Sequence, residues 1–130
     1  MRERRWGRII NVTASSVLAP RPTFGLSVAT WAGVIGFAKT LSHEMAEENI
    51  TVHTLCPGRI DTPRLGRVFG SGPGQIDAAQ HQAMIDAIPM KRLGTLDDCA
   101  GLVAFLCSQW ADYMTGCVFS VDGGRRANLI

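Results

Sequence analysis

Hydroxyl side chains are the first candidates for chemistry in this sequence, and they occur in two places. Thr13, Ser15 and Ser16 follow a short apolar segment, and Ser27 lies at the start of a longer segment with helical spacing. A hydroxyl group can both donate and accept a hydrogen bond. Alternatively, the first three hydroxyls satisfy backbone groups of their own loop. We favour this second interpretation.

Three arginines form a second group. Arg59, Arg64 and Arg67 follow the dipeptide Pro57-Gly58 within a few residues of each other. Guanidinium groups bind carboxylates and phosphates through paired hydrogen bonds, so the group could attract an anionic ligand. A solvated loop is an equally good interpretation, and the sequence leaves both open.

The histidines and cysteines are not predicted to form a metal site. His43, His53 and His81 have no mutual spacing that suggests a shared ligand, so each is interpreted as a surface or packing residue. The four cysteines contain no Cys-x-x-Cys pair and lie among apolar residues. They are predicted to be buried free thiols in a reducing cytoplasm, without a disulfide or a bound zinc ion. These are Cys56, Cys99, Cys107 and Cys117.

Three strands and two long helices are predicted to position these side chains. Residues 8–13, 50–55 and 117–121 are short apolar runs rich in β-branched residues, which is typical of buried strands. Residues 26–45 and 96–108 carry apolar side chains at helical spacing. The alternation of strand and helix predicts a parallel sheet with right-handed crossovers.

The first helix is predicted to bury one apolar face although it contains Gly33 and Gly36. Each internal glycine costs about 1 kcal/mol relative to alanine, so we expect another helix or backbone to approach closely there. In the second helix Thr95 is expected to cap the N-terminus, with Asp97 and Asp98 in the first turn. The predicted buried face of the first helix consists of Val34, Phe37, Ala38, Leu41 and Met45.

Length and composition restrict the class of protein. With 130 residues, of which 46% are hydrophobic, the chain fits one globular domain over residues 1–130. The net charge of +2 gives no reason to expect nucleic-acid binding. No apolar segment approaches the ~20 residues that span a bilayer, and the charged N-terminus does not resemble a secretory signal. Residues 61–87 lack a strong pattern and include the glycine-rich residues 70–74, which is typical of a functional or mobile segment.

Six short motifs occur in an order and spacing that resemble one protein family. They are GRIINV at residues 7–12, AGVIGF at 32–37, PGRIDT at 57–62, RLGTLDD at 92–98, TG at 115–116 and VDGG at 121–124. Together they resemble the short-chain dehydrogenase/reductase family, most closely its β-ketoacyl-carrier-protein-reductase-like branch. The resemblance implies an α/β fold, the C-terminal part of a doubly wound (Rossmann-like) parallel sheet, with three strands and flanking helices.

The resemblance also implies which positions carry the reaction. The family has a Tyr-x-x-x-Lys pair in the helix and a Ser thirteen residues before the Tyr, and these positions are Ser27, Trp31 and Ala14 here. A phenol beside an ammonium can protonate a developing alkoxide. Serine is a much weaker acid, and tryptophan carries no charge. Ser27 is therefore the remaining catalytic candidate, and a one-residue shift of the loop could bring Ser15 to the family's Ser position.

The family's cofactor contact is partly retained. The turn that holds the nicotinamide carboxamide in the family matches Pro57, Gly58, Ile60 and Thr62, which are the predicted cofactor-binding residues for NAD(P). A helix cap is a compatible role for Thr62. The family's glycine-rich phosphate turn and its catalytic Asn have no counterpart in this sequence.

Three interpretations of function follow. The first is an oxidoreductase that uses NAD(P) on a small carbonyl or acyl substrate once a further segment completes it. Arg59, Arg64 and Arg67 could then attract an anionic substrate such as an acyl phosphopantetheine or a carboxylate. The second is a pseudoenzyme or a non-catalytic module that associates with itself or with a full-length relative. The third is an atypical reductase with another proton donor. Nucleic-acid and membrane partners are not predicted.

We expect marginal stability for the isolated chain, because the edge of its first strand and apolar helix faces would be exposed.

Overall fold

A three-stranded parallel sheet forms the centre of the computed structural model, which describes residues 1–70 and 76–127. Its strands are β1 (Gly7–Val12), β2 (Ile50–Pro57) and β3 (Val118–Val121), in the order β1-β2-β3. Residue Gly7 is paired with Ile50, and Thr54 with Val118. The predicted α/β class and all three predicted strands are confirmed, with differences of one or two residues at their ends.

Helices connect and flank the strands. The two long helices expected from apolar spacing are present as α1 (Gly25–Met45) and α4 (Leu96–Leu106). Two further helices, α2 (Pro63–Phe69) and α3 (Ala78–Asp86), lie in the segment without a strong pattern. Of the glycine-rich residues in that segment, 71–74 lie outside the described residues. Single 3-10 turns are η1 (Ser15–Val17), η2 (Ala46–Glu48) and η3 (Gln109–Ala111).

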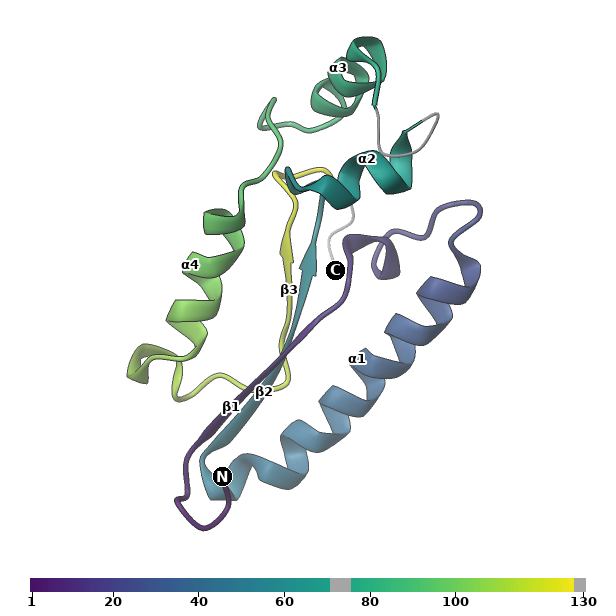
Figure 1. Cartoon of the computed structure of the whole chain (residues 1–130). Helices are drawn as coiled ribbons and strands as arrows, with labels where there is room; N and C mark the ends of the chain where they lie inside the picture. Colours follow the sequence, from purple (N-terminus) through teal and green to yellow (C-terminus); the bar gives the residue numbers. More distant parts are fainter. Residues whose placement is uncertain (71–75, 128–130) are drawn as a thin grey trace.

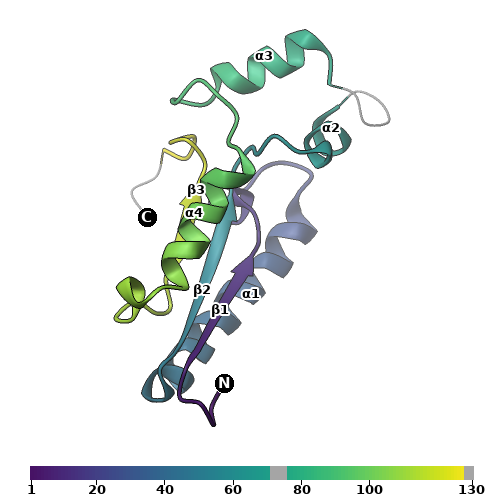
Figure 2. The ribbon, with the colours of Figure 1, turned by 60° about the vertical axis from the view of Figure 1, so that its left-hand side comes forward.

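The sheet is covered on both faces, as a doubly wound fold requires. Figures 1 and 2 show α1 against one face of the strands and α4 against the other. The strand order advances in one direction, so two crossovers of the same hand would place both helices on one face. The expectation of two right-handed crossovers is therefore wrong for one of them. The connection from β2 to β3 passes through α2 and α3 before α4, so it is not a simple strand–helix–strand unit.

The core is built around β2, whose first seven residues are buried. Ala38 and Met45 of α1 pack on it, and Leu106 of α4 is fully buried. The prediction that Phe37 shares the buried face of α1 is wrong, because its side chain is 67% exposed. Successive residues of a helix differ by about 100°, so Phe37 points well away from its buried neighbour Ala38.

The outer face of α1 has no cover within the described chain. A Cβ atom added at Gly33 or Gly36 would meet no atom within 4 Å, so the close backbone approach expected at these glycines is absent. The strand β1 pairs with β2 alone among the described residues, and its side chains are mostly half-buried instead of buried. Large apolar side chains are exposed, as expected, and Val12 at the end of β1 is 64% exposed.

Candidate functional site

A cavity of about 340 Å³ lies at the carboxyl ends of β1 and β2. Its walls come from the loop after β1, from α1, from the turn after β2, and from α2, which lies across the strand ends in Figure 1. Ligand sites of open α/β sheets form at this end of the strands, because the connecting loops gather there. The cavity is lined by the arginines Arg21, Arg59, Arg64 and Arg125, by the hydroxyls of Thr13, Ser15, Ser16 and Thr62, and by apolar side chains that include Phe24, Trp31, Leu65 and Phe69.

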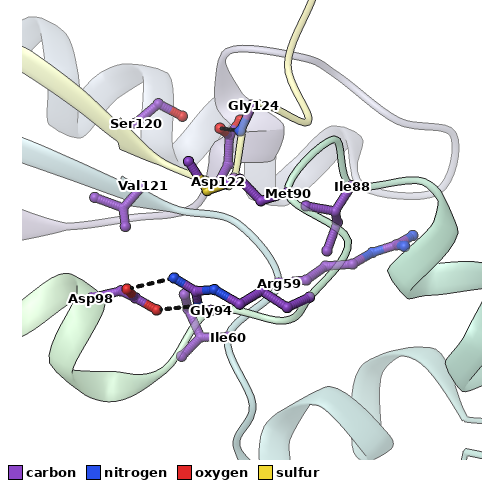
Figure 3. A pocket seen from close by; sticks show the side chains of 12 residues that line it. Arg59, Ile60, Ile88, Met90, Gly94, Asp98, Ser120, Val121, Asp122 and Gly124 are labelled. Carbon is purple, nitrogen blue, oxygen red and sulfur yellow. Dashed lines mark hydrogen bonds and ion pairs between the residues drawn. The ribbon is translucent and has the colours of Figure 1, made fainter.

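A second cavity of about 350 Å³ shares Arg59 and Ile60 with the first, so the same turn borders both. Figure 3 shows its carboxylate Asp98, which is held by the guanidinium of Arg92 at 2.7 and 3.0 Å. Its other carboxylate, Asp122, accepts hydrogen bonds from two backbone N–H groups. Because both carboxylates are engaged within the chain, we place the candidate site in the first cavity.

The turn after β2 is held by backbone contacts on both sides. The N–H of Gly58 donates to the carbonyl of Val121 at 2.8 Å. A Cβ atom at Gly58 would lie 2.6 Å from the Cβ of Asp122, so only glycine fits at this position. Gly94 exchanges two hydrogen bonds with the turn, at 2.9 Å to the carbonyl of Arg59 and at 2.8 Å from the N–H of Asp61. The turn is therefore fixed from both β3 and the segment before α4.

The backbone groups of Ile60 are not used in the contact between the turn and Gly94. In the parallel bridge between Ile60 and Gly94, the hydrogen bonds use the neighbours of Ile60, so its own N–H and C=O point away from Gly94. Thr62 begins α2 as its N-cap residue, but its hydroxyl makes no capping hydrogen bond and instead donates to the carbonyl of Ile60 at 3.5 Å. Pro57, Gly58, Ile60 and Thr62 all line the cavity. The four predicted cofactor-binding residues are thus brought together.

The structure brings two of the three positions that correspond to the family's catalytic residues to the cavity, but not the third. Ala14 and Trp31 line the cavity, whereas Ser27 is not among its lining residues. Ser27 lies one helical turn before Trp31 on α1, so the two share a face, and Ser27 is half-buried. The hydroxyl of Thr13 lies 3.2 Å from the sulfur of Cys56 and 3.4 Å from the carbonyl of Leu55.

The cavity contains few titratable groups. Besides the four arginines, Cys99 is the one titratable side chain among its lining residues, and burial raises the pKa of its thiol. Burial also lowers the pKa of Arg59, together with the nearby charges of Arg125 and Arg21. Arg59 and Arg64 could be identified from their spacing, whereas Arg21 and Arg125 could not, because no local pattern links positions so distant in the chain. Arg67, the third arginine of the predicted group, does not line the cavity.

The remaining histidines and cysteines lie elsewhere. His53 is 1% exposed and packs at 5.5 Å between ring centroids against Phe119, whereas His43 and His81 are exposed. Of the four thiols predicted to be buried, Cys56 is buried and Cys99 and Cys117 are half-buried. Cys107 is exposed, so the prediction is wrong at that position. Cys107 directly follows the last residue of α4, where the helix end reaches solvent.

Residues 1–70 and 76–127 contain neither a cluster of potential metal ligands nor a membrane-spanning helix. This part of the chain contains no group of three or more His, Cys, Asp or Glu side chains able to hold a metal ion. None of its helices has the length and apolar character needed to cross a membrane.

Comparison with known proteins identifies the family. The model of the family described as Enoyl-(Acyl carrier protein) reductase matches residues 1–126. The chain belongs to the short-chain dehydrogenase/reductase family. Its relatives include the "Nodulation protein G" of Azospirillum brasilense, 38% identical over 95% of this chain and 47% of the relative. The 3-oxoacyl-(acyl-carrier-protein) reductase of Rickettsia conorii is 36% identical over 95% of this chain and 48% of its own length.

Members from other sources agree with this assignment. The human "Dehydrogenase/reductase SDR family member 4" is 33% identical over 99% of this chain and 44% of the human protein. The crystal structure of YwfH, an NADPH-dependent reductase involved in bacilysin biosynthesis, superimposes with a TM-score of 0.90 at 32% identity. It covers 98% of this chain and 50% of the YwfH chain. The chain spans about half the length of the short-chain dehydrogenase/reductase relatives it matches.

Proposed function

We propose that this short-chain dehydrogenase/reductase chain binds a small carbonyl or acyl ligand in the cavity beside Pro57–Thr62 without catalysing the family's reaction by itself. The observation that carries the proposal is the placement of Ala14 and Trp31 in the cavity, where the family has a Ser and a Lys. The chain is accordingly a pseudoenzyme, or the ligand-binding part of a larger NAD(P)-dependent oxidoreductase of the cytoplasm.

The chemical argument concerns the side chain that would supply a proton to the carbonyl oxygen during reduction. Reduction of a carbonyl places negative charge on its oxygen, and a positioned acid must supply a proton as that charge develops. Arginines keep their protons at neutral pH, and burial makes the Cys99 thiol a weaker acid than usual. The hydroxyls of Ser15 and Ser16 line the cavity, but no lysine is among the lining residues to lower their pKa. None of the described lining groups is therefore a good proton donor at neutral pH.

The residues present fit the nicotinamide carboxamide of NAD(P) better than its pyrophosphate. The backbone N–H of Ile60, which the bridge to Gly94 leaves unused, would donate to a carboxamide oxygen, and the Ile60 carbonyl and the Thr62 hydroxyl, which bond to each other at 3.5 Å, would accept from its amide. A bound NAD(P) would supply the hydride of a carbonyl reduction. No described strand is followed by a glycine-rich turn that opens a helix, which is the usual cradle of the pyrophosphate. We therefore expect weak or unmeasurable binding of NADPH to this chain.

The test is a reductase assay with the purified chain. We expect no oxidation of NADH or NADPH with aldehydes, ketones or acyl thioesters, and no heat of binding when NADPH is titrated into the protein. Turnover by the chain would overturn the proposal. If that turnover were lost in the variant Ser27→Ala but kept in the control Thr30→Ala, the atypical reductase with Ser27 as proton donor would be the correct interpretation.

A second candidate function is association with another protein chain through α1. The outer face of that helix favours it, because Gly33 and Gly36 are uncovered there and Phe37 is 67% exposed. Exposed apolar area of this kind marks interaction surfaces. A second copy of this chain or a full-length relative would cover it. Sedimentation of the chain as a monomer at all concentrations, alone and with such a relative, would remove this candidate.

A further inference from the structure

Three guanidinium groups from distant parts of the chain meet at one cavity. Arg21 comes from the loop before α1, Arg59 from the turn after β2, and Arg125 from the segment after β3. Their charges act on one another, because the proximity of Arg125 and Arg21 opposes protonation of Arg59. Like charges gathered in a partly buried place destabilise the fold unless something compensates them.

Aromatic rings and one carbonyl hold the arginines in place. The guanidinium carbons of Arg21 and Arg59 lie 5.1 and 5.7 Å from the ring centre of Phe69. Phe69 in turn stacks on Phe24, with 6.3 Å between ring centroids and 14° between the planes. Arg59 also donates from Nη1 to the carbonyl of Met84 at 2.9 Å. These contacts orient the cations but supply no negative charge.

The described residues only partly compensate the repulsion among the three arginines. No aspartate or glutamate is among the lining residues of the cavity. The Nε atoms of Arg59 and Arg125 are buried and have no hydrogen-bond partner there. A buried donor without an acceptor is unfavourable, and more so when it carries charge. The cavity is therefore lined by oriented cationic side chains without a matching negative charge, which points to an anionic ligand.

We propose that Arg21, Arg59 and Arg125 bind the carboxylate or phosphate group of a small amphipathic ligand, whose apolar part lies against Phe24, Phe69 and Trp31. All six side chains line the same cavity of about 340 Å³, which suits a ligand of modest size. Trp31 provides a flat apolar wall at the position where the family has a charged lysine. The inference rests on the proposed role of this cavity as a ligand site, and names the class of ligand.

Binding can be measured with Trp31 as the reporter. The variant Trp6→Phe/Trp110→Phe leaves Trp31 as the single tryptophan, because Trp6 and Trp110 do not line the cavity. Hexanoate, hexyl phosphate, inorganic phosphate and uncharged hexanamide are titrated against its fluorescence. We expect hexanoate or hexyl phosphate to bind at least about tenfold more tightly than hexanamide, because hydrogen bonds between charged groups contribute more than those to a neutral amide. The ratio between hexanoate and hexyl phosphate separates carboxylate from phosphate recognition.

Matched charge variants separate the site from general electrostatics. Arg125→Gln is expected to weaken binding of the preferred anion by about tenfold, whereas Arg67→Gln, which removes an exposed arginine of α2, changes it less than about twofold. Equal effects of the two variants, or equal binding of hexanamide and the anions, would overturn the inference.

Stability provides an independent readout. Because Arg125 adds repulsion to the cluster, Arg125→Gln should raise the midpoint of thermal unfolding in the absence of anion, and Arg21→Gln serves as the second variant. Lower midpoints for both would mean that the arginines stabilise the fold internally, and would also overturn the inference. The proposed function fails separately, since turnover of NADPH would contradict that function without affecting the anion result.

Discussion

Gly58 and Asp122 approach each other so closely that a single methyl group would not fit between them. A Cβ on Gly58 would lie 2.6 Å from the Cβ of Asp122 and 2.7 Å from its Cα. This contact joins the end of β2, which begins the cavity turn, to the end of β3. The position of Ile60 and Thr62 therefore depends on a glycine that need not touch any ligand.

Replacement of Gly58 by alanine should destabilise the chain. The added methyl group would push the ends of β2 and β3 apart, with a loss of about 1–3 kcal/mol in the free energy of unfolding. Urea denaturation followed by circular dichroism measures the change. The matched control is Gly33→Ala, where nothing lies within 4 Å and helix propensity predicts a gain of up to about 1 kcal/mol. An unchanged stability of Gly58→Ala would show that β3 moves freely relative to the turn.

The start of α4 depends on a reciprocal cap. The hydroxyl of Thr95 accepts from the N–H of Asp98 at 3.2 Å, and the Asp98 carboxylate accepts from the N–H of Thr95 at 2.7 Å. Thr95→Ala should lower the free energy of unfolding by about 1 kcal/mol, since one helix N-terminal donor loses its acceptor. Urea denaturation measures the loss. Thr40→Ala, near the C-terminal end of α1, is the control and should have a smaller effect.

The same cap predicts a response to acid. The Arg92 guanidinium and Thr95 hold the pKa of Asp98 well below its usual range. The stabilisation by Asp98 is therefore complete above the pKa of the unfolded carboxyl, about 3.9, and is lost as the pH falls further. Asp98→Asn should be less stable than the parent at pH 7, with the difference shrinking toward pH 2. Urea titrations at several pH values measure this, and a constant difference would contradict it.

The buried ring of His53 predicts a second pH dependence of stability, at higher pH than that of Asp98. Burial lowers the pKa of His53 from the ordinary 6.5, and the charge of Arg8 lowers it further, whereas the nearby backbone of Met114 raises it in part. The folded chain disfavours the protonated ring, so the stability linked to His53 is complete above about pH 6.5 and decreases as the pH falls below it. His53→Gln should flatten this part of the profile, and the exposed control His81→Gln should leave it unchanged. Thermal unfolding between pH 5 and 8 compares them.

The uncovered face of α1 predicts concentration-dependent stability. If a second copy covers Phe37, the midpoint of thermal unfolding will rise with protein concentration, because association favours the folded state. Phe37→Ser should remove that dependence, whereas Thr40→Ser, also exposed on α1, should retain it. A monomer with a cooperative transition and a stability of several kcal/mol would contradict both the association and the marginal stability that we expect.

Local patterns predicted the elements of this fold correctly. The β-branched runs form β1, β2 and β3, and the capping role of Thr95 is confirmed. These properties depend on neighbours in the chain, which is why spacing and residue type are sufficient to find them. The motif PGRIDT likewise forms one continuous turn, so the residues from Pro57 to Thr62 could be identified as a unit from their order alone.

Long-range packing, in contrast, decides which side chains face the cavity and which face solvent. Phe37 fits the apolar spacing but is exposed, since the sheet covers the side of α1 that carries Ala38. Ser27 matches a catalytic position in spacing but does not line the cavity. Arg21, Arg59 and Arg125 are far apart in the chain and meet because parallel strands bring their carboxyl ends to one edge. Residue type and spacing are thus enough to find the family and the local elements, whereas the packing of distant strands sets the charge and the shape of the site.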